Sequence, residues 1–316
     1  MKRIVKISCV VVLLLFALAG YNFSKAAKDN KQKPRLFGAT YMTRNNPFFN
    51  ILNESIKEVV EANGDYLIVR DPQQNQERQN QQILDMIEEG IEVLFLNPVN
   101  WETVKPALEA CKEAGVGIIN IDTVVKDTDF VLNIVETDNY QAGAECARDM
   151  VKRMRKAKIV ILNNPMQTSI TDRIKGFKDV IKDKEKYEIV AEIKGASEIE
   201  IAAEAMAEYL GINTDFDVVL GGNDPSAIGA LSSLQQFKAD ENVKIYGIDG
   251  SPDFKAMLAL GHVTATSAQS PKTIGRVAVE NAYKYLAGQT LEKHIKLPTK
   301  LITKENLHEY EINGWQ

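Results

Sequence analysis

Residues 36–49 read LFGATYMTRNNPFF, and this stretch joins a strand to a helix through a polar loop. The apolar run Leu36–Thr40 predicts a buried strand. Pro47 is suited to the first turn of the helix that follows, where a missing N–H costs nothing. In an open parallel sheet, ligands bind at the carboxyl ends of the strands. The loop after Thr40 is therefore a candidate binding loop.

The side chains at the end of this loop are of the kinds that hold a sugar ring. Asn46 has an amide that both donates and accepts hydrogen bonds, and Phe48 and Phe49 offer flat apolar faces. A monosaccharide has hydroxyls around its rim and C–H groups on its faces, which matches this combination. The alternative is a helix start whose two phenylalanines simply enter the core, since phenylalanine is mostly buried.

From Lys33 onward, strand and helix patterns alternate as in a doubly wound parallel α/β sheet. The first round predicts strands at 36–40, 66–69, 93–96 and 117–121, with a further strand-like run at 130–135. The helices expected between them span 48–62, 76–89 and 103–114. Asp138 then stands in a polar break, where it can cap a helix over 140–155.

A second round of the same alternation follows. Its expected strands are 159–162, 187–193, 218–220, 244–248 and 263–265, and its helices begin near Thr171, Glu198, Pro225, Pro252 and Lys272. A chain of 316 residues with 45% apolar content can bury two cores. The sequence therefore predicts two α/β domains of similar architecture.

Residues 1–26 are expected to lie outside that fold. Basic residues precede the apolar run Ile7–Gly20, and Ser24–Ala26 offers small residues where a signal peptidase cleaves. The segment is interpreted as a signal peptide or as an uncleaved membrane anchor, because Ile4–Phe23 approaches the roughly 20 residues that span a bilayer. Cleavage moves the formal net charge from −5 to about −9, which argues against nucleic acid as a partner.

Enzymatic classes lack their motifs in this sequence. It has no GxGxxG or GxxxxGK phosphate loop and no GxSxG nucleophile turn. His262, His294 and His308 are placed at a strand start, on a late strand and in the tail, without partners at metal-ligand spacing. Asp122 and Asp249 form a glycosidase pair only at a suitable separation. The chain is interpreted as a binding protein without a cofactor or metal.

Polar residues follow successive expected strands. Asn97, Asp122, Asn163, Asn223 and Asp249 each lie at or near a strand end. Such residues also cap helices and form turns, so each has a local alternative role. Their recurrence at one kind of position favours a shared cleft.

These residues also carry a family resemblance. The chain resembles the periplasmic ribose-binding and related type I sugar-binding proteins of ABC transporters through an ordered set of segments, namely Asn45–Phe49, Asn97–Pro98, Ile121–Asp122, Arg173–Phe177, Gly222–Asp224, Gly247–Asp253 and Thr266–Gln269. The resemblance covers essentially the whole chain after the export segment. It implies two α/β domains joined by three crossings, with a sugar between them. One domain is expected to comprise 34–137 plus 270–297 and the other 138–269 plus 298–316.

The resemblance also assigns the ligand contacts. It gives Asn46, Phe48, Phe49 and Asp122 to the first domain, Arg173 and Asn223 to the second, and Asp249 and Gln269 to the vicinity of the hinge. Thr123 departs from the pattern, since the ribose-binding relatives carry an arginine there. Met42 stands where they carry a serine, and the aromatic that stacks from their second domain has no clear equivalent around Ser197 and Glu198. These departures distinguish the expected site from a ribose site.

Together these features predict an extracytoplasmic solute-binding protein. It is expected to capture a monosaccharide, a pentose or hexose, by hinge closure and to deliver it to an ABC transporter permease. The alternative is a membrane-anchored receptor that signals sugar binding to a membrane histidine kinase. Both place the protein in the periplasm or at the extracellular face of the membrane, with no nucleic acid as a partner.

Overall fold

The computed structural model describes residues 33–194 and 197–316. The predicted export segment, residues 1–26, lies outside these residues. Within the described part of the chain, no helix combines the length and apolar character needed to cross a bilayer.

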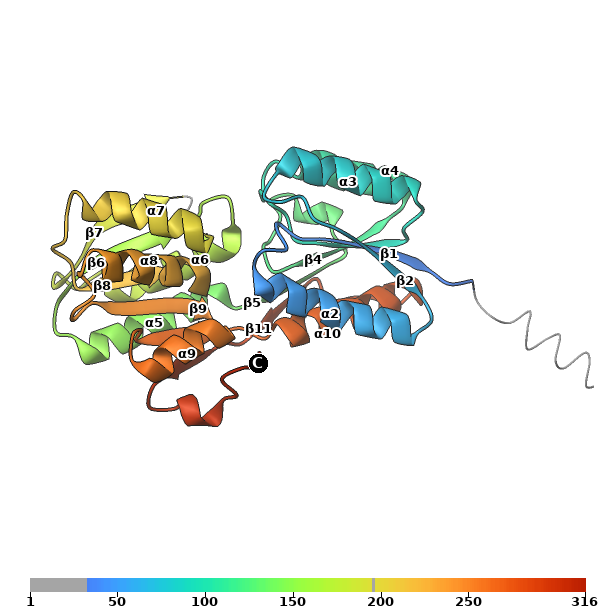
Figure 1. The fold of residues 1–316 in the computed structure, drawn as a ribbon. Coiled ribbons are helices and arrows are strands. Elements are labelled where there is room, and N and C mark those ends of the chain that lie inside the picture. The colour runs from blue at the N-terminus through green and yellow to red at the C-terminus, as the bar shows by residue number, and fades with distance from the viewer. Residues whose placement is uncertain (1–32, 195–196) are drawn as a thin grey trace, which may run out of the picture. The chain divides into compact units, whose positions relative to one another are not determined.

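The first sheet is built mainly from the early part of the chain (Figure 1). Its six strands are β1 (Leu36–Thr40), β2 (Tyr66–Arg70), β3 (Val93–Leu96), β4 (Gly117–Ile121), β5 (Asn133–Thr137) and β11 (His294–Leu297). Their order across the sheet is β11-β5-β4-β3-β1-β2, and all neighbours are parallel. Helices α2 (Pro47–Ala62) and α10 (Pro271–Leu286) cover one face, and α3 (Gln76–Glu88) and α4 (Lys105–Ala114) cover the other.

Strand β3 shows why this sheet has a core on each face. Successive side chains of a strand point to opposite sides. Val93 and Phe95 therefore join the apolar cluster under α2 and α10, whereas Leu94 and Leu96 join the cluster under α3 and α4. All four side chains are buried, so the strand reads as a continuous apolar run, as strands of parallel sheets do.

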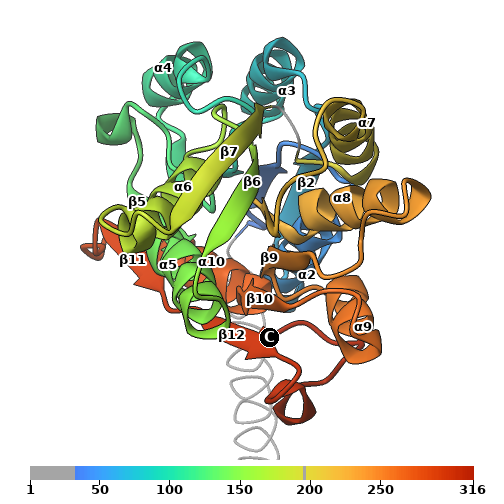
Figure 2. The ribbon, with the colours of Figure 1, turned by 90° about the vertical axis from the view of Figure 1, so that its left-hand side faces the viewer.

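The second sheet repeats this plan (Figure 2). Its six strands are β6 (Ala157–Asn163), β7 (Tyr187–Lys194), β8 (Val218–Gly221), β9 (Lys244–Asp249), β10 (Ala265–Ala268) and β12 (Lys300–Thr303). Their order is β12-β10-β9-β8-β6-β7, with β12 antiparallel to β10 and the other pairs parallel. Helices α5 (Asn139–Arg153) and α6 (Thr168–Ile181) pack on one face, and α7 (Ile199–Leu210) and α8 (Asp224–Gln236) on the other, while α9 (Pro252–Leu260) follows β9.

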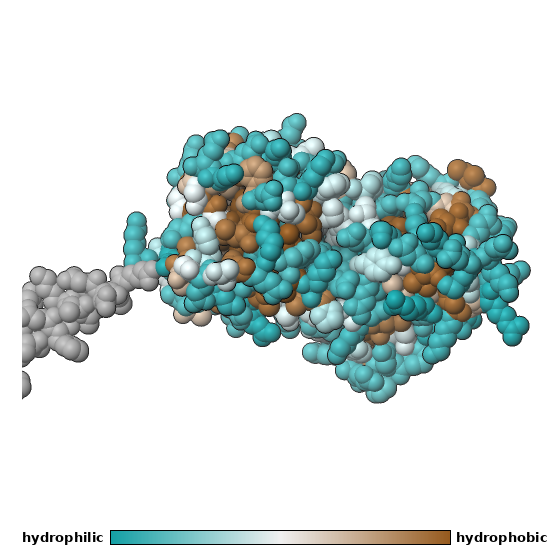
Figure 3. Space-filling view, turned by 180° about the vertical axis from the view of Figure 1, so that it is seen from behind, coloured by the Kyte–Doolittle hydropathy of each residue, from teal (hydrophilic) through white to brown (hydrophobic). Residues whose placement is uncertain are grey.

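The chain passes between the two sheets three times. The passages lie between β5 and β6, between β10 and β11, and between β11 and β12. The predicted α/β class with two doubly wound, mainly parallel sheets is thus confirmed. The domain bounds given above remain a prediction. Hydrophilic side chains cover most of the face shown in Figure 3, with apolar residues visible between them.

Helices α5 and α6 approach each other closely through two glycines. A Cβ on Gly143 would lie 1.7 Å from the carbonyl oxygen of Arg173, and a Cβ on Gly176 would lie 2.0 Å from that of Tyr140. Any side chain at these positions would push the helices apart. The two glycines therefore determine how closely α6 packs against α5.

Several element boundaries differ from the sequence prediction, and three of them have an identifiable cause or consequence. Thr128–Phe130 forms a 3₁₀ turn, and the strand expected at 130–135 begins only at Asn133, where pairing with β4 starts. Helix α6 begins at Thr168, because the hydroxyl of Thr171 hydrogen-bonds back to the Thr168 carbonyl oxygen inside the helix. Strand β10 begins at Ala265, so His262 lies in the turn after α9 and not at a strand start.

Candidate functional site

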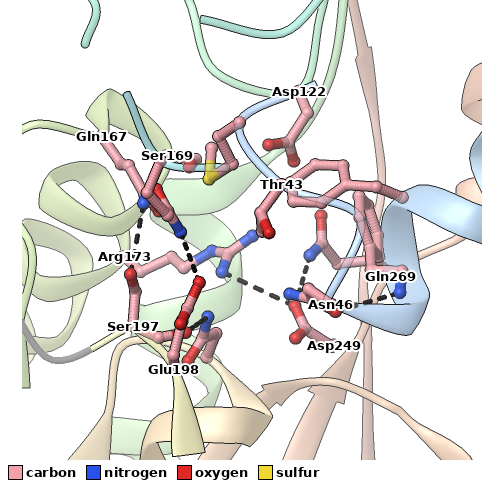
Figure 4. A pocket seen from close by; sticks show the side chains of 15 residues that line it. Thr43, Asn46, Asp122, Gln167, Ser169, Arg173, Ser197, Glu198, Asp249 and Gln269 are labelled. Carbon is pink, nitrogen blue, oxygen red and sulfur yellow. Dashed lines mark hydrogen bonds and ion pairs between the residues drawn. The ribbon is translucent and has the colours of Figure 1, made fainter. Parts of the chain in front are cut away.

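Residues from the ends of strands in both sheets line one pocket of about 380 Å³ (Figure 4). The centre of a water-sized sphere fits in only about 20 Å³ of it, so the lining side chains lie close together. The lining consists of Met42, Thr43, Asn46, Phe48, Phe49, Gln74, Asp122, Gln167, Ser169, Arg173, Ser197, Glu198, Asn223, Asp249 and Gln269.

All eight residues that the sequence assigned to the site lie in this lining. The residues that sequence reasoning did not assign are Met42, Thr43, Gln74, Gln167, Ser169, Ser197 and Glu198. Each of them follows a strand that ends at the pocket, namely β1, β2, β6 or β7. The rule that ligands bind at the carboxyl ends of strands, applied to every strand, would have found them.

Arg173 occupies the middle of the pocket and is 3% exposed. It lies in the second turn of α6, on the face that the glycine contacts press toward α5. Its Nε donates to Asn139 Oδ1 at 2.8 Å, and its Nη1 donates to the Gly222 carbonyl oxygen at 2.9 Å. The same Nη1 lies 3.6 Å from Asp249 Oδ1. The guanidinium is thus held in one orientation by groups of the second sheet.

Two buried aspartates face this arginine from different sheets. Asp122 Oδ2 accepts from Asn97 Nδ2 at 3.0 Å and from the Thr123 hydroxyl at 3.3 Å. Asp249 Oδ1 accepts from Gln269 Nε2 at 2.6 Å. Burial raises the pKa of Asp122, and it raises the pKa of Asp249 to about 8, although Arg173 opposes the rise in both cases. Carboxylates with raised pKa values in a pocket are typical of functional sites.

The backbone is strained at the same two aspartates. Asp122 has φ 61° and Asp249 has φ 155°, values that L-residues adopt uncommonly. Such strain persists only where the surrounding structure imposes it, and it gathers at binding and catalytic sites. Both carboxylates are therefore aimed by the fold at a cost in conformational energy.

The aromatic side of the pocket is rigidly packed. The rings of Phe48 and Phe49 meet edge to face at 5.3 Å, and Phe49 stacks on Tyr41 at 5.9 Å. Trp315, near the end of the chain, packs edge to face on Phe48 at 5.9 Å. Phe48 and Phe49 therefore serve as core residues and as pocket residues at once, because both are buried and both line the pocket.

Local capping roles coexist with the pocket positions of the two asparagines. Asn46 caps α2 by accepting from the backbone N–H of Phe48 at 3.0 Å. Asn223 caps α8 by accepting from the N–H of Ser226 at 2.9 Å, and its Nδ2 donates to the Ser197 carbonyl oxygen at 3.0 Å. Capping fixes the direction of each amide, so it positions these side chains and does not exclude them from ligand contact.

Loops of the two sheets also contact each other around the pocket. Gln74 Nε2 donates to Glu198 Oε1 at 2.9 Å, and the hydroxyls of Thr123 and Ser169 lie 3.0 Å apart. Thr123 is fully buried in that contact and does not line the pocket. The position where ribose-binding relatives carry an arginine is thus used here for a contact between the loop after β4 and the first turn of α6.

Comparison with known proteins gives this fold and site a family. The chain belongs to the periplasmic binding protein domain family, which matches residues 37–290. It is 27% identical over 306 residues to the ribose import binding protein of Bacillus subtilis, covering 95% of this chain and 99% of that protein. These relationships confirm the resemblance to type I sugar-binding proteins of ABC transporters.

Solved structures agree with this assignment. The myo-inositol binding protein of Caulobacter, bound to myo-inositol, is 26% identical with a TM-score of 0.82, covering 89% of this chain and 98% of that one. The binding protein of the arabinose ABC transporter of Shewanella sp. ANA-3, bound to L-arabinofuranose, is 25% identical with a TM-score of 0.81, covering 87% and 93%. These relatives are named as binding proteins, so the chain is a solute-binding protein and not an enzyme.

Proposed function

We propose that this protein is an extracytoplasmic solute-binding protein that captures a monosaccharide or a related polyhydroxylated ring and delivers it to an ABC transporter permease. The observation that supports this most strongly is the shared pocket, where buried charged groups and amides from the strand ends of both sheets surround an aromatic wall. The same combination binds hydroxyls at a ring's rim and C–H groups on its face.

Each part of the lining has a separate task in this proposal. Asp122 and Asp249 accept hydrogen bonds from pairs of neighbouring hydroxyls, and Arg173 donates to one of them or to a ring oxygen. Gln269 and Asn223 complete the ring of polar contacts. Phe48 and Phe49 cover an apolar face of the sugar, with Asn46 at the edge.

Closure follows from the division of these groups between two bodies. We assign residues 34–137 plus 270–297 to one body and 138–269 plus 298–316 to the other. A ligand that contacts both bodies binds the closed arrangement better than the open one, so it shifts the population toward closure. A permease then recognises the closed form. The basic and apolar pattern of residues 1–26 supports export.

Calorimetry on the purified protein lacking residues 1–26 tests this function. We expect at least one member of a panel of pentoses, hexoses, inositols and their amino derivatives to bind, and chromatography to recover it chemically unchanged. Binding is expected to reduce the radius of gyration measured by X-ray scattering. Conversion of the ligand, or a folded protein that binds no member of the panel, contradicts the proposal.

A further inference from the structure

The charged side chains that line the pocket are unbalanced. Asp122, Asp249 and Glu198 contribute three carboxylates, whereas Arg173 contributes one guanidinium. Among the described lining residues there is no lysine and no histidine. A ligand with hydroxyl groups alone leaves this imbalance in place.

Arg173 offsets the charge of these acidic side chains only in part. Its Nε and Nη1 are committed to Asn139 and to the Gly222 carbonyl oxygen, and its nearest carboxylate is that of Asp249 at 3.6 Å. It also acts electrostatically on Asp224, a buried residue outside the pocket lining, whose pKa burial raises to about 6 although the arginine opposes the rise. One cation is thus shared among buried acids of the second sheet.

The other two carboxylates of the lining have neutral hydrogen-bond donors. The donors to Asp122 are the Asn97 amide and the Thr123 hydroxyl, and the donor to Glu198 is the Gln74 amide. Of these two, Asp122 is buried and Glu198 is half-buried, and a buried carboxylate is costly unless a cation pairs with it or a proton neutralises it. The raised pKa of Asp122 agrees with that cost, because desolvation outweighs the hydrogen bonds and the more distant Arg173.

We propose that the ligand of this pocket is a polyhydroxylated ring that carries a protonated amine, that is, an amino sugar or an aminocyclitol, whose ammonium group pairs with the buried carboxylate of Asp122, while Glu198 on the pocket wall adds negative charge that favours a cation. This inference rests on the proposed sugar-binding function and adds the charge of the ligand. An ammonium group has three donors and no acceptor, so it satisfies several carboxylate oxygens at once. The hydroxyls of the same ring remain matched to Asn223, Gln269 and Asp249.

The inference also defines which ligands the pocket rejects. A uronic acid or a sugar phosphate brings a further negative charge beside the acidic side chains of Asp122 and Glu198, and like charges in a desolvated site repel strongly. We therefore expect the amino sugar to bind most tightly, the neutral parent sugar less tightly, and the sugar that carries a carboxylate least tightly. Discrimination of this kind is a difference between affinities and is measured on matched ligands.

Calorimetry with matched ligand sets tests the order. The sets are glucosamine, glucose and glucuronate, the corresponding galactose set, and an inosamine with its parent inositol, all at pH 6.5, where the amines are protonated. For the set that binds, the amine is expected to bind at least about tenfold more tightly than the neutral parent. Two variants each replace one carboxylate by a neutral amide, namely Glu198→Gln and Asp122→Asn. Asparagine is suited to position 122 because it tolerates the left-handed backbone conformation there.

The expected result is that each variant lowers the ratio of amine to neutral affinity by at least about fivefold. The control is Glu200→Gln, which removes an exposed carboxylate two residues away on α7 and is expected to leave the ratio unchanged. Melting curves confirm that each variant is folded. A neutral sugar that binds as tightly as its amine, or a ratio that neither variant lowers, overturns the inference while leaving the sugar-binding function intact. Failure of every ligand to bind contradicts both.

Discussion

The substitution Asp249→Asn is expected to stabilise the folded protein at pH 8 while weakening ligand binding. The fold raises the pKa of this carboxyl from 3.8 to about 8, mainly through burial, with the neighbouring Asp224 adding to the rise and Arg173 opposing it. The folded protein therefore holds the proton more tightly than the unfolded chain does. Stability falls as the pH rises from about 4 to about 8 and the buried group is forced to ionise. Asparagine never ionises, so it removes this loss.

The size of the effect follows from the shift. One pKa unit corresponds to about 1.4 kcal/mol of free energy. Ionisation of the coupled pair Asp249 and Asp224 in the folded protein therefore lowers the free energy of unfolding by on the order of 5 kcal/mol at pH 8. Loss of the 3.6 Å ion pair with Arg173 offsets part of the gain. We expect a net stabilisation of about 2 kcal/mol, which raises the melting temperature by roughly 4–8 °C at pH 8. At pH 5 the carboxyl already holds its proton in the folded protein, so little of that gain remains.

Calorimetric melting of the wild type and the variant at pH 5 and pH 8 measures this difference. The control is Asp253→Asn, since Asp253 is exposed in the first turn of α9. At pH 8, Asp249→Asn is also expected to weaken ligand binding by about 1.5–3 kcal/mol, because a neutral amide replaces a hydrogen-bond acceptor that can ionise. A variant that melts below the wild type at pH 8, or a difference that does not change between the two pH values, refutes the reasoning.

Three further substitutions probe other parts of the site. Arg173→Met removes the cation beside the pocket aspartates and is expected to weaken ligand binding at least about a hundredfold in calorimetry. A loss of affinity below about tenfold would mean that the arginine has a structural role only. Gly143→Ala places a methyl group against the Arg173 backbone. We expect the free energy of unfolding in denaturant melts to fall by about 3 kcal/mol or more. Wild-type stability would show that α5 and α6 move apart freely. Trp315→Ala removes a ring from Phe48, and we expect binding weaker by about 0.5–1.5 kcal/mol, whereas unchanged affinity means that the tail does not support the aromatic wall.

The elements of this fold could be predicted because local signals and tertiary structure agree. The apolar run Leu36–Thr40 is a strand with the predicted bounds, and Asp138 caps α5 as expected. Boundaries shifted where pairing decides the end of an element. Strand β10 begins at Ala265 because its register is set by Tyr246 on β9 and Thr303 on β12, which the local sequence of β10 does not reveal.

The site was predictable in its strand-end residues and less so in its flanking loops. Asp122 and Asp249 stand directly at the ends of apolar strands, where the sequence marks them. Glu198 and Gln74 become neighbours only when loops that are 124 positions apart in the sequence meet. The burial of Arg173 depends on the close approach of α5 and α6, and this approach is a tertiary property.

A crystal structure of the complex with the tightest-binding ligand of the panel would show whether one ring contacts the strand ends of both sheets. We predict one ring in the pocket at the strand ends, with hydrogen bonds between its substituents and Asp122 on one side and Arg173, Asn223 and Asp249 on the other, where Arg173 is the donor. One face of the ring is expected against Phe48 or Phe49. A ligand bound elsewhere, for example in the groove between α2 and α10 lined by Ser55 and Arg276, or a ligand that touches residues of one sheet alone, would contradict the account.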